Sequence, residues 1–193
     1  PKIDSNKRVL GVIRPSTEVI GQYTRSNYIG VLATEGTVSS GSYEIELQKF
    51  SPQCKVFQQS CPLLVPLIEN NEYNTEAGRQ FIKDDVDTLL QQNKRIDTIL
   101  LGCTHYPVVK KYIESIVPEG VQVIAQGKIV ADSIADYLLR HPMMNSCCTK
   151  NGSVHFLTTE NNIEFDKTAS QYIDVAVHST HISLPNSSLG SQS

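Results

Sequence analysis

Short aliphatic runs that alternate with helix-like stretches are the feature that most constrains the fold of this chain. The runs are rich in β-branched residues and lie at residues 9–13, 28–33, 54–58, 98–102, 121–125 and 154–158. Near-continuous apolar strands joined by helical crossovers are typical of a parallel sheet that is covered on both faces. The pattern therefore predicts an α/β fold with a doubly wound, mostly parallel sheet.

The helical stretches carry their own signals. Apolar residues recur at three- and four-residue intervals between residues 76 and 92, which predicts an amphipathic helix that ends at Asn93. Pro107 suits the first turn of a second helix, expected at residues 108–117. From residue 174 onward the chain is rich in Ser, Asn, Gly and Gln, so residues 174–193 are expected to form a disordered tail.

Composition excludes several classes of protein. No run approaches the length of a membrane span and no signal peptide opens the sequence, so a cytoplasmic protein without membrane contact is expected. The formal net charge is −3 and the basic residues do not cluster, which argues against a nucleic-acid partner.

The cysteines and histidines give no metal signature. The 5 cysteines show no CxxC spacing, which argues against both a zinc site and a disulfide framework, and most are expected to be free thiols. His178 and His181 lie close in sequence, but two histidines without further ligands do not make a metal site. No metal and no cofactor is therefore expected.

The segment LLGCTHYP, residues 100–107, places chemically active side chains directly after a predicted strand. Ligands of open α/β sheets bind beyond the carboxyl ends of strands, and a thiol near a helix N-terminus is favoured as the thiolate. Cys103 is either a reactive thiol or a small residue that fills the strand end. Thr104 either binds a carboxylate or caps the helix. His105 either exchanges protons with the thiol or is an interior histidine bound to a carbonyl.

Two further strand ends carry polar side chains. The hydroxyls of Thr34 and Thr37 could hold a carboxylate, or they could only cap a helix start. Glu69 lies near the end of a short helix that follows Cys61, either as a surface residue or as an acidic partner of His105. Because all of these loops follow strands, we expect them to face one cleft.

Together and in this order, these segments resemble the glutamate racemases within the aspartate/glutamate racemase superfamily. The resemblance is carried by LGCTHYP, ATEGTVSSGSY, CPLLVPLIE and FLTTENNIEFDKTASQYI, and it extends from about Val9 to Ile173. It implies a cofactor-independent, two-base interconversion of L- and D-glutamate that supplies D-glutamate for peptidoglycan synthesis.

The resemblance also implies roles for single residues. Cys103 matches the cysteine that deprotonates L-glutamate, and Thr104 matches a residue that binds a substrate carboxylate. His105 matches the assisting histidine, Glu69 the acidic residue near it, and Thr34 with Thr37 the hydroxyl loop. The implied partner is glutamate, and a homodimer is compatible with the family.

The sequence departs from the family pattern at its start. The family's Asp-Ser-Gly, Pro-Tyr-Gly and Cys-Asn-Thr loops, the last with the first catalytic cysteine, do not occur in these 193 residues. We therefore expect a C-terminal portion of a racemase that is inactive alone. Residues 1–14 and 126–173 would be remnants of the N-terminal lobe, and residues 15–125 the central α/β lobe. The alternatives are a racemase of aspartate or another amino acid, and a non-catalytic carboxylate-binding domain.

Overall fold

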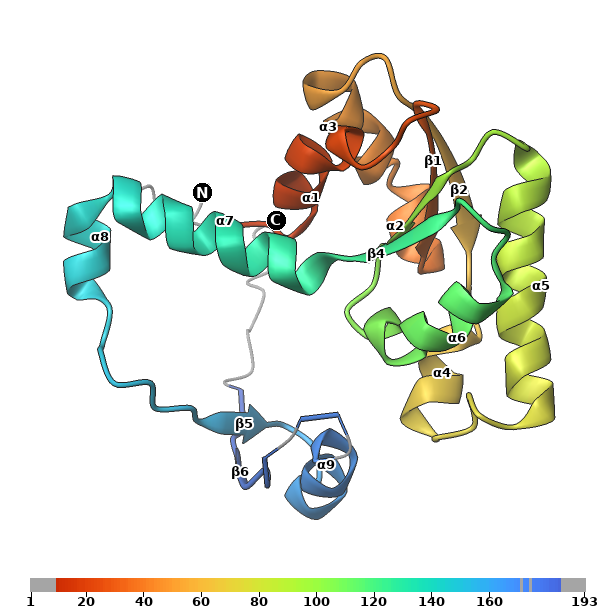
Figure 1. Cartoon of the computed structure of the whole chain (residues 1–193). Coiled ribbons are helices and arrows are strands. Elements are labelled where there is room, and N and C mark those ends of the chain that lie inside the picture. The colour runs from red at the N-terminus through yellow and green to blue at the C-terminus, as the bar shows by residue number, and fades with distance from the viewer. Residues whose placement is uncertain (1–9, 171, 174, 185–193) are drawn as a thin grey trace, which may run out of the picture. The chain divides into compact units, whose positions relative to one another are not determined.

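The computed structural model describes residues 10–170, 172–173 and 175–184 (Figure 1). The chain divides into two compact units, Pro1–Asn145 and Ser146–Ser193. Helix α8 (Pro142–Cys147) crosses the boundary between them. None of the helices in the described ranges is both long and apolar enough to cross a membrane. The expected division into a central lobe and remnants of a second lobe stays a prediction.

The first unit is built on a parallel sheet of four strands in the order β2-β1-β3-β4. Its strands are β1 (Tyr28–Ala33), β2 (Lys55–Ser60), β3 (Thr98–Leu101) and β4 (Gln122–Ala125). Every residue of β3 and all but the first of β1 are buried, as expected for central strands covered on both faces. The predicted α/β class with a parallel sheet is confirmed.

Helices cover both faces of this sheet. Figure 1 shows α1 (Ile13–Val19) and α3 (Ser42–Phe50) on one side and α5 (Glu76–Gln92) on the other, where α5 packs against α6 (Lys110–Ile116). The chain crosses the sheet in one direction from β1 to β2 and in the other direction from β2 to β3. Because both crossovers are right-handed, their helices lie on opposite faces of the sheet. The other helices of the unit are η1 (Ile20–Gln22), α2 (Glu35–Ser39), α4 (Leu64–Glu69), η2 (Tyr106–Val109) and α7 (Gln126–Arg140).

Helix α5 has the bounds that its sequence pattern predicts. The Thr75 side chain accepts a hydrogen bond from the Gly78 amide and so caps the first turn. Ile82, Val86 and Leu89 are buried, at the three- and four-residue spacing that directs one helix face toward the core. The second predicted helix differs slightly, because a 3-10 turn, η2, precedes α6.

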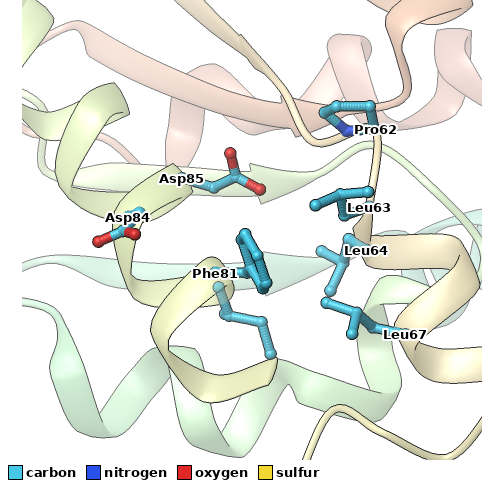
Figure 2. Close-up of a pocket in the computed structure, with 8 residues that line it drawn as sticks. Pro62, Leu63, Leu64, Leu67, Phe81, Asp84 and Asp85 are labelled. Atoms are coloured by element: carbon cyan, nitrogen blue, oxygen red, sulfur yellow. The ribbon is translucent and has the colours of Figure 1, made fainter. Parts of the chain in front are cut away.

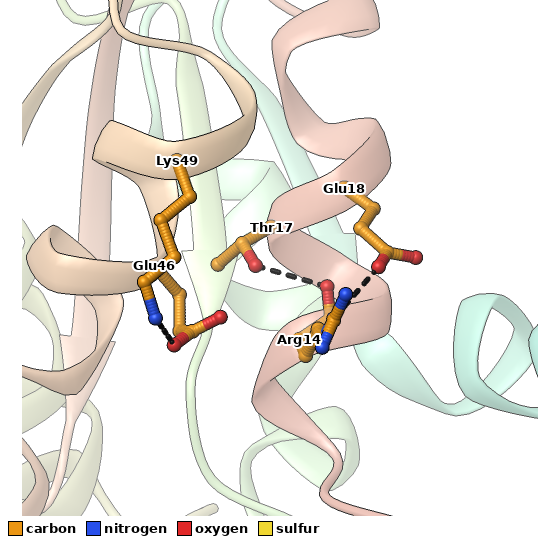
Figure 3. A network of polar contacts seen from close by, with 5 residues as sticks. All are labelled: Arg14, Thr17, Glu18, Glu46 and Lys49. Atoms are coloured by element: carbon orange, nitrogen blue, oxygen red, sulfur yellow. Dashed lines mark hydrogen bonds and ion pairs between the residues drawn. The ribbon is translucent and has the colours of Figure 1, made fainter.

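The strand expected at residues 9–13 is wrong over the residues that are described. Residues 10–12 form no strand, and Ile13 opens α1; Val9 lies outside the described residues. Local contacts favour the helix. Arg14 pairs with Glu18 at 2.9 Å, one turn along, and the Thr17 hydroxyl donates to the Arg14 carbonyl (Figure 3). On α3, Lys49 pairs with Glu46 in the same local way.

Helices α1 and α3 close a core cluster on their side of the sheet. The buried members come from η1, β1, α3 and β3 and from the turn before β2: Ile20, Ile29, Val31, Ala33, Tyr43, Leu47, Cys54 and Leu100. Burying side chains of this size is the main source of stability in a domain, at about 25 cal/mol per Å² of apolar surface. The cluster therefore fixes the strand ends that carry the candidate site.

Asp97, directly before β3, fixes the turn that leads into β1. Its carboxylate accepts hydrogen bonds from the Thr24 hydroxyl at 2.6 Å and from the backbone amides of Arg25 and Ser26 at 2.9 and 2.7 Å. Partial burial raises the pKa of Asp97, but these hydrogen bonds to the ionised form outweigh burial and bring the pKa below its ordinary value.

The second unit contains β5 (Phe156–Thr158), α9 (Asn162–Ala169) and β6 (Ser179–His181). The strands pair in parallel, with Leu157 opposite Thr180, and the Asn161 side chain caps α9 by accepting from the amides of Ile163 and Glu164. Strand β6 lies within the segment expected to be a disordered tail. Its pairing with β5, and the Ser179 amide bound to the Asp166 carboxylate at 2.8 Å, account for this difference. Residues 174 and 185–193 of that segment lie outside the described residues.

Candidate active site

The candidate site lies at the carboxyl edge of the parallel sheet. Leu32 of β1 pairs with Leu101 of β3, so Thr34 and Cys103 follow two neighbouring strand ends. The chain leaves β1 toward α2 and α3, and it leaves β3 toward α6 on the opposite face. Such a point, where neighbouring strands connect in opposite directions, is where open α/β sheets bind ligands.

Cys103, His105 and Glu69 form a connected series at this edge. The Cys103 Sγ lies 3.8 Å from His105 Nδ1, and His105 Nε2 lies 3.1 Å from Glu69 Oε1. The last contact joins the end of α4 to the loop after β3. A carboxylate on one ring nitrogen orients an imidazole, which leaves the other nitrogen free to exchange a proton with the thiol. The structure thus brings together the three residues that the sequence suggested as catalytic.

The series is accessible from solvent. Cys103 is half-buried, and the side chains of His105 and Glu69 are 36% and 55% exposed. His105 is therefore not an interior histidine bound to a carbonyl. Glu69 is a surface residue, and its carboxylate contacts the His105 ring. A thiol, an imidazole and a carboxylate arranged in this order can accept a proton from a bound molecule.

Gly102 sets the path of the loop that carries Cys103. Its amide donates to the Leu32 carbonyl at 2.7 Å, which extends the β1–β3 ladder by one bond. A Cβ atom at this position would lie 3.0 Å from both the Leu32 oxygen and a ring carbon of Tyr43, and 3.1 Å from the Ala33 Cβ. Only glycine lets the strand end approach this closely.

Tyr106 ties the Cys103 loop to the end of β2. Its hydroxyl is buried and donates to the Cys61 carbonyl at 3.3 Å, and its amide donates to the Cys103 carbonyl at 3.3 Å. Burial raises the pKa of Tyr106, and the charges of Cys61, Cys103 and Asp85 add to the rise, so the phenol stays a neutral donor. The sequence analysis assigned Tyr106 no role, although the residue lies inside the LLGCTHYP segment.

Thr34 and Thr37 lie at the start of α2, whereas Thr104 lies in the loop after β3. Thr34 caps α2, because its hydroxyl oxygen accepts from the Thr37 amide at 3.4 Å, and the two hydroxyl oxygens lie 3.0 Å apart. Both side chains are partly exposed, so capping leaves their outer faces open to a ligand. Thr104 is exposed, and His105 rather than Thr104 is the residue that precedes η2, so Thr104 is not its N-cap.

Cys54 and Cys61 are poor candidates for a base. Burial raises the pKa of both thiols, with the Asp97 charge adding at Cys54 and the Asp85 charge adding at Cys61. The Cys61 thiol also donates to the Gln59 carbonyl at 3.7 Å, which favours its protonated form. Cys147 and Cys148 are exposed.

A small cavity of about 90 Å³ lies between α4, the residues just before it and α5 (Figure 2). Apolar side chains of α4 and α5 form its wall, with the Asp84 and Asp85 carboxylates beside them. Burial raises the pKa of Asp85, while hydrogen bonds with Cys61 and Gln59 oppose the rise. The cavity contains none of the candidate site residues in its lining, so it is a separate feature.

The histidines near the C-terminus do not gather further ligands. His178 and His181 are both exposed. Within residues 10–170, 172–173 and 175–184, no group of three or more His, Cys, Asp and Glu side chains could hold a metal ion.

Comparisons with known proteins point to one family. Residues 5–134 match the Asp/Glu/Hydantoin racemase family. The chain is 35% identical over 166 residues to a glutamate racemase of Levilactobacillus brevis, a match that covers 86% of this chain and 59% of that protein. The chain therefore spans less than two thirds of the length of this relative.

Solved structures have the same fold as this chain. The crystal structure of a glutamate racemase isoform from Bacillus anthracis superposes with a TM-score of 0.86 at 28% identity, covering 95% of this chain and 68% of that one. The glutamate racemase of Francisella tularensis, solved in complex with D-glutamate, gives a TM-score of 0.80 at 23% identity, covering 94% and 66%.

Proposed function

Because this chain belongs to the Asp/Glu/hydantoin racemase family, we propose that it takes part in the cofactor-independent interconversion of L- and D-glutamate. The observation that carries the proposal is the Cys103–His105–Glu69 series at the carboxyl edge of the sheet. D-Glutamate made in this way would serve peptidoglycan synthesis.

In the proposed reaction, Cys103 removes the α-proton of L-glutamate. The Cα–H bond breaks, its electron pair stays on the substrate as a planar carbanion, and the proton moves to the Cys103 sulfur. An amino-acid α-proton is a very weak acid, so this step requires a thiolate and oriented donors for the negative charge that develops on the substrate.

His105 accepts the proton of the Cys103 thiol before this step. With its Nε2–H donating to the Glu69 carboxylate, the Nδ1 atom faces the sulfur as an acceptor and can take the thiol proton. The resulting imidazolium lies between a thiolate and a carboxylate. Glu69 therefore acts through His105, as an orienting and charge-balancing group.

The hydroxyls of Thr34, Thr37 and Thr104 are the proposed binders of the substrate carboxylates. Thr34 and Thr37 would reach the substrate from the end of β1, and Thr104 from the loop after β3. Hydroxyl donors on both sides of a carboxylate orient the substrate without competing for its α-proton.

The second base of the reaction is proposed to come from a part of the protein beyond these 193 residues. The candidate series supplies a base on one side of the proposed substrate, whereas racemisation must return a proton to the opposite face of the carbanion. The relative in Levilactobacillus brevis is matched over 59% of its length. We expect the 193-residue chain to exchange the α-proton on one face without producing the other enantiomer.

Glutamate is the proposed substrate because the relatives at 30% identity or more are glutamate racemases. The family as a whole also includes aspartate and hydantoin racemases. Side-chain selectivity is therefore part of the test rather than a consequence of the fold.

The test follows the Cα–H signal of L-glutamate, D-glutamate and L-aspartate, each in a separate sample, by proton NMR in D₂O with the purified chain. Chiral chromatography of the L-glutamate sample shows whether D-glutamate forms. The expected result is loss of the L-glutamate signal without formation of D-glutamate. Equal exchange of aspartate would contradict the assignment to glutamate. Absence of exchange, combined with protection of Cys103 from alkylation by glutamate, would favour a non-catalytic carboxylate-binding domain.

A further inference from the structure

Gln126 lies next to the Cys103 loop, although neither its sequence context nor the proposed chemistry points to it. It is the first residue of α7, directly after β4, which is the neighbour of β3 (Figure 1). Its side-chain Nε2 donates to the Leu101 carbonyl at 3.0 Å. Leu101 ends β3, two residues before Cys103. The amide of Gln126 therefore holds the backbone at the point where the catalytic loop begins.

A buried serine holds the other end of this amide. The Ser16 hydroxyl, fully buried on α1, donates to Gln126 Oε1 at 2.8 Å. The Leu101 carbonyl can only accept, so it fixes the amide nitrogen on its side, and the Ser16 hydroxyl donates to the amide oxygen on the other side. Satisfied polar networks of this kind specify one arrangement of the groups they join.

Tyr43 connects the same amide with Cys103. Its ring packs against Gly102, and its hydroxyl is buried without a hydrogen-bond partner of good geometry in the described part of the chain. Burial raises the pKa of Tyr43 to about 12, while the Gln126 amide lowers it and the charge of Cys103 raises it further.

We propose that Gln126 is a positioning residue for Cys103: held by Ser16 at its oxygen, its amide anchors the Leu101 carbonyl so that the thiol stays beside His105. The inference rests on the proposed role of Cys103 as a base. Gln126 touches neither the thiol nor the substrate, and it acts through the backbone of residues 101–103.

The test compares Gln126→Met with Gln122→Met in the 193-residue chain. Gln122 is the matched control, because its side-chain amide also donates to a backbone carbonyl, that of Tyr23, but at the opposite end of β4. The measurement is the rate of alkylation of Cys103 by iodoacetamide between pH 5 and 10, followed by mass spectrometry of its peptide. The exposed Cys147 in the same molecules is the internal reference.

We expect Gln126→Met to slow the alkylation of Cys103 at neutral pH on the order of tenfold and to move its pH profile toward that of Cys147. At high pH, where every thiol is ionised, the rate reports only accessibility, so the shape of the profile separates ionisation from exposure. Gln122→Met should leave both unchanged. An unchanged Cys103 profile in Gln126→Met would overturn the proposal.

Two further measurements cover the cases in which Gln126→Met does not fold or Cys103 is not the base. If Gln126→Met does not fold, Ser16→Ala, which removes the hydrogen bond that holds Gln126 Oε1, should shift the Cys103 profile in the same direction, and no shift would refute the anchor. If the wild-type Cys103 profile already equals that of Cys147, the proposed base fails. The anchor is then judged by hydrogen exchange of the Gly102 amide, which bonds to Leu32 and should lose protection in Gln126→Met alone.

Discussion

Substitution of Gly102 by alanine should weaken the fold and displace the Cys103 loop together. The added Cβ would meet a carbonyl oxygen, an aromatic ring carbon and a Cβ atom at 3.0 to 3.1 Å. These neighbours belong to β1 and to the core residue Tyr43, so none can move aside as a flexible side chain would. Overpacking of this kind costs about 1–3 kcal/mol of the free energy of unfolding.

Gly127→Ala is the matched control, because Gly127 also follows a strand end. A Cβ there has no atom within 4 Å, and alanine in a helix is favoured over glycine by up to about 1 kcal/mol. Urea unfolding followed by circular dichroism should therefore give changes of opposite sign for the two variants. In a unit of this size, each kcal/mol lost by Gly102→Ala should lower the melting temperature by about 2–4 °C. A Gly102→Ala protein as stable as the wild type would refute the close approach of β1, Tyr43 and the Cys103 loop.

The remaining predictions concern a carboxylate, a buried phenol and the proposed proton relay. The folded-state pKa of Asp97 lies below its unfolded value of about 3.9, so its stabilisation is complete above about pH 4 and is lost as the pH falls through the folded value. Urea unfolding should therefore show Asp97→Asn to be less stable by about 1–3 kcal/mol at pH 7 and by much less near pH 3, and a pH-independent difference would contradict this. Tyr106→Phe removes the bond to the Cys61 carbonyl and should cost about 1–2 kcal/mol in the same assay; full stability would show that the bond contributes nothing. Glu69→Gln should slow α-proton exchange on the order of tenfold or more with little change in stability, and unchanged exchange would remove Glu69 from the relay.

Local sequence patterns predicted the central elements well. Strand Tyr28–Ala33 and helix Glu76–Gln92 have their predicted bounds, because a buried strand and an amphipathic helix each repeat their signal within one segment. The run at residues 9–13 misled because a short aliphatic stretch fits either a strand or a helix start, and here only Ile13 enters an element, as the first residue of α1.

The candidate site could be predicted only in part. Placing Cys103 and Thr34 at one sheet edge follows from strand order, which parallel topology makes predictable. The contact of Glu69 with His105 joins segments 36 residues apart, and sequence suggested it only as one alternative. Gln126 could not be predicted, because it belongs to no motif or periodic pattern. Its proposed role depends on a hydrogen bond to the Leu101 carbonyl of the neighbouring strand, which only the structure shows.

The most direct test of the central claim is α-proton exchange of L-glutamate in D₂O by the wild-type chain, Cys103→Ser and Cys147→Ser, with all three compared at equal folded concentration. If the Cys103 sulfur receives the α-proton, exchange disappears in Cys103→Ser and persists at the wild-type rate in Cys147→Ser. Exchange that continues unchanged in Cys103→Ser would contradict the account.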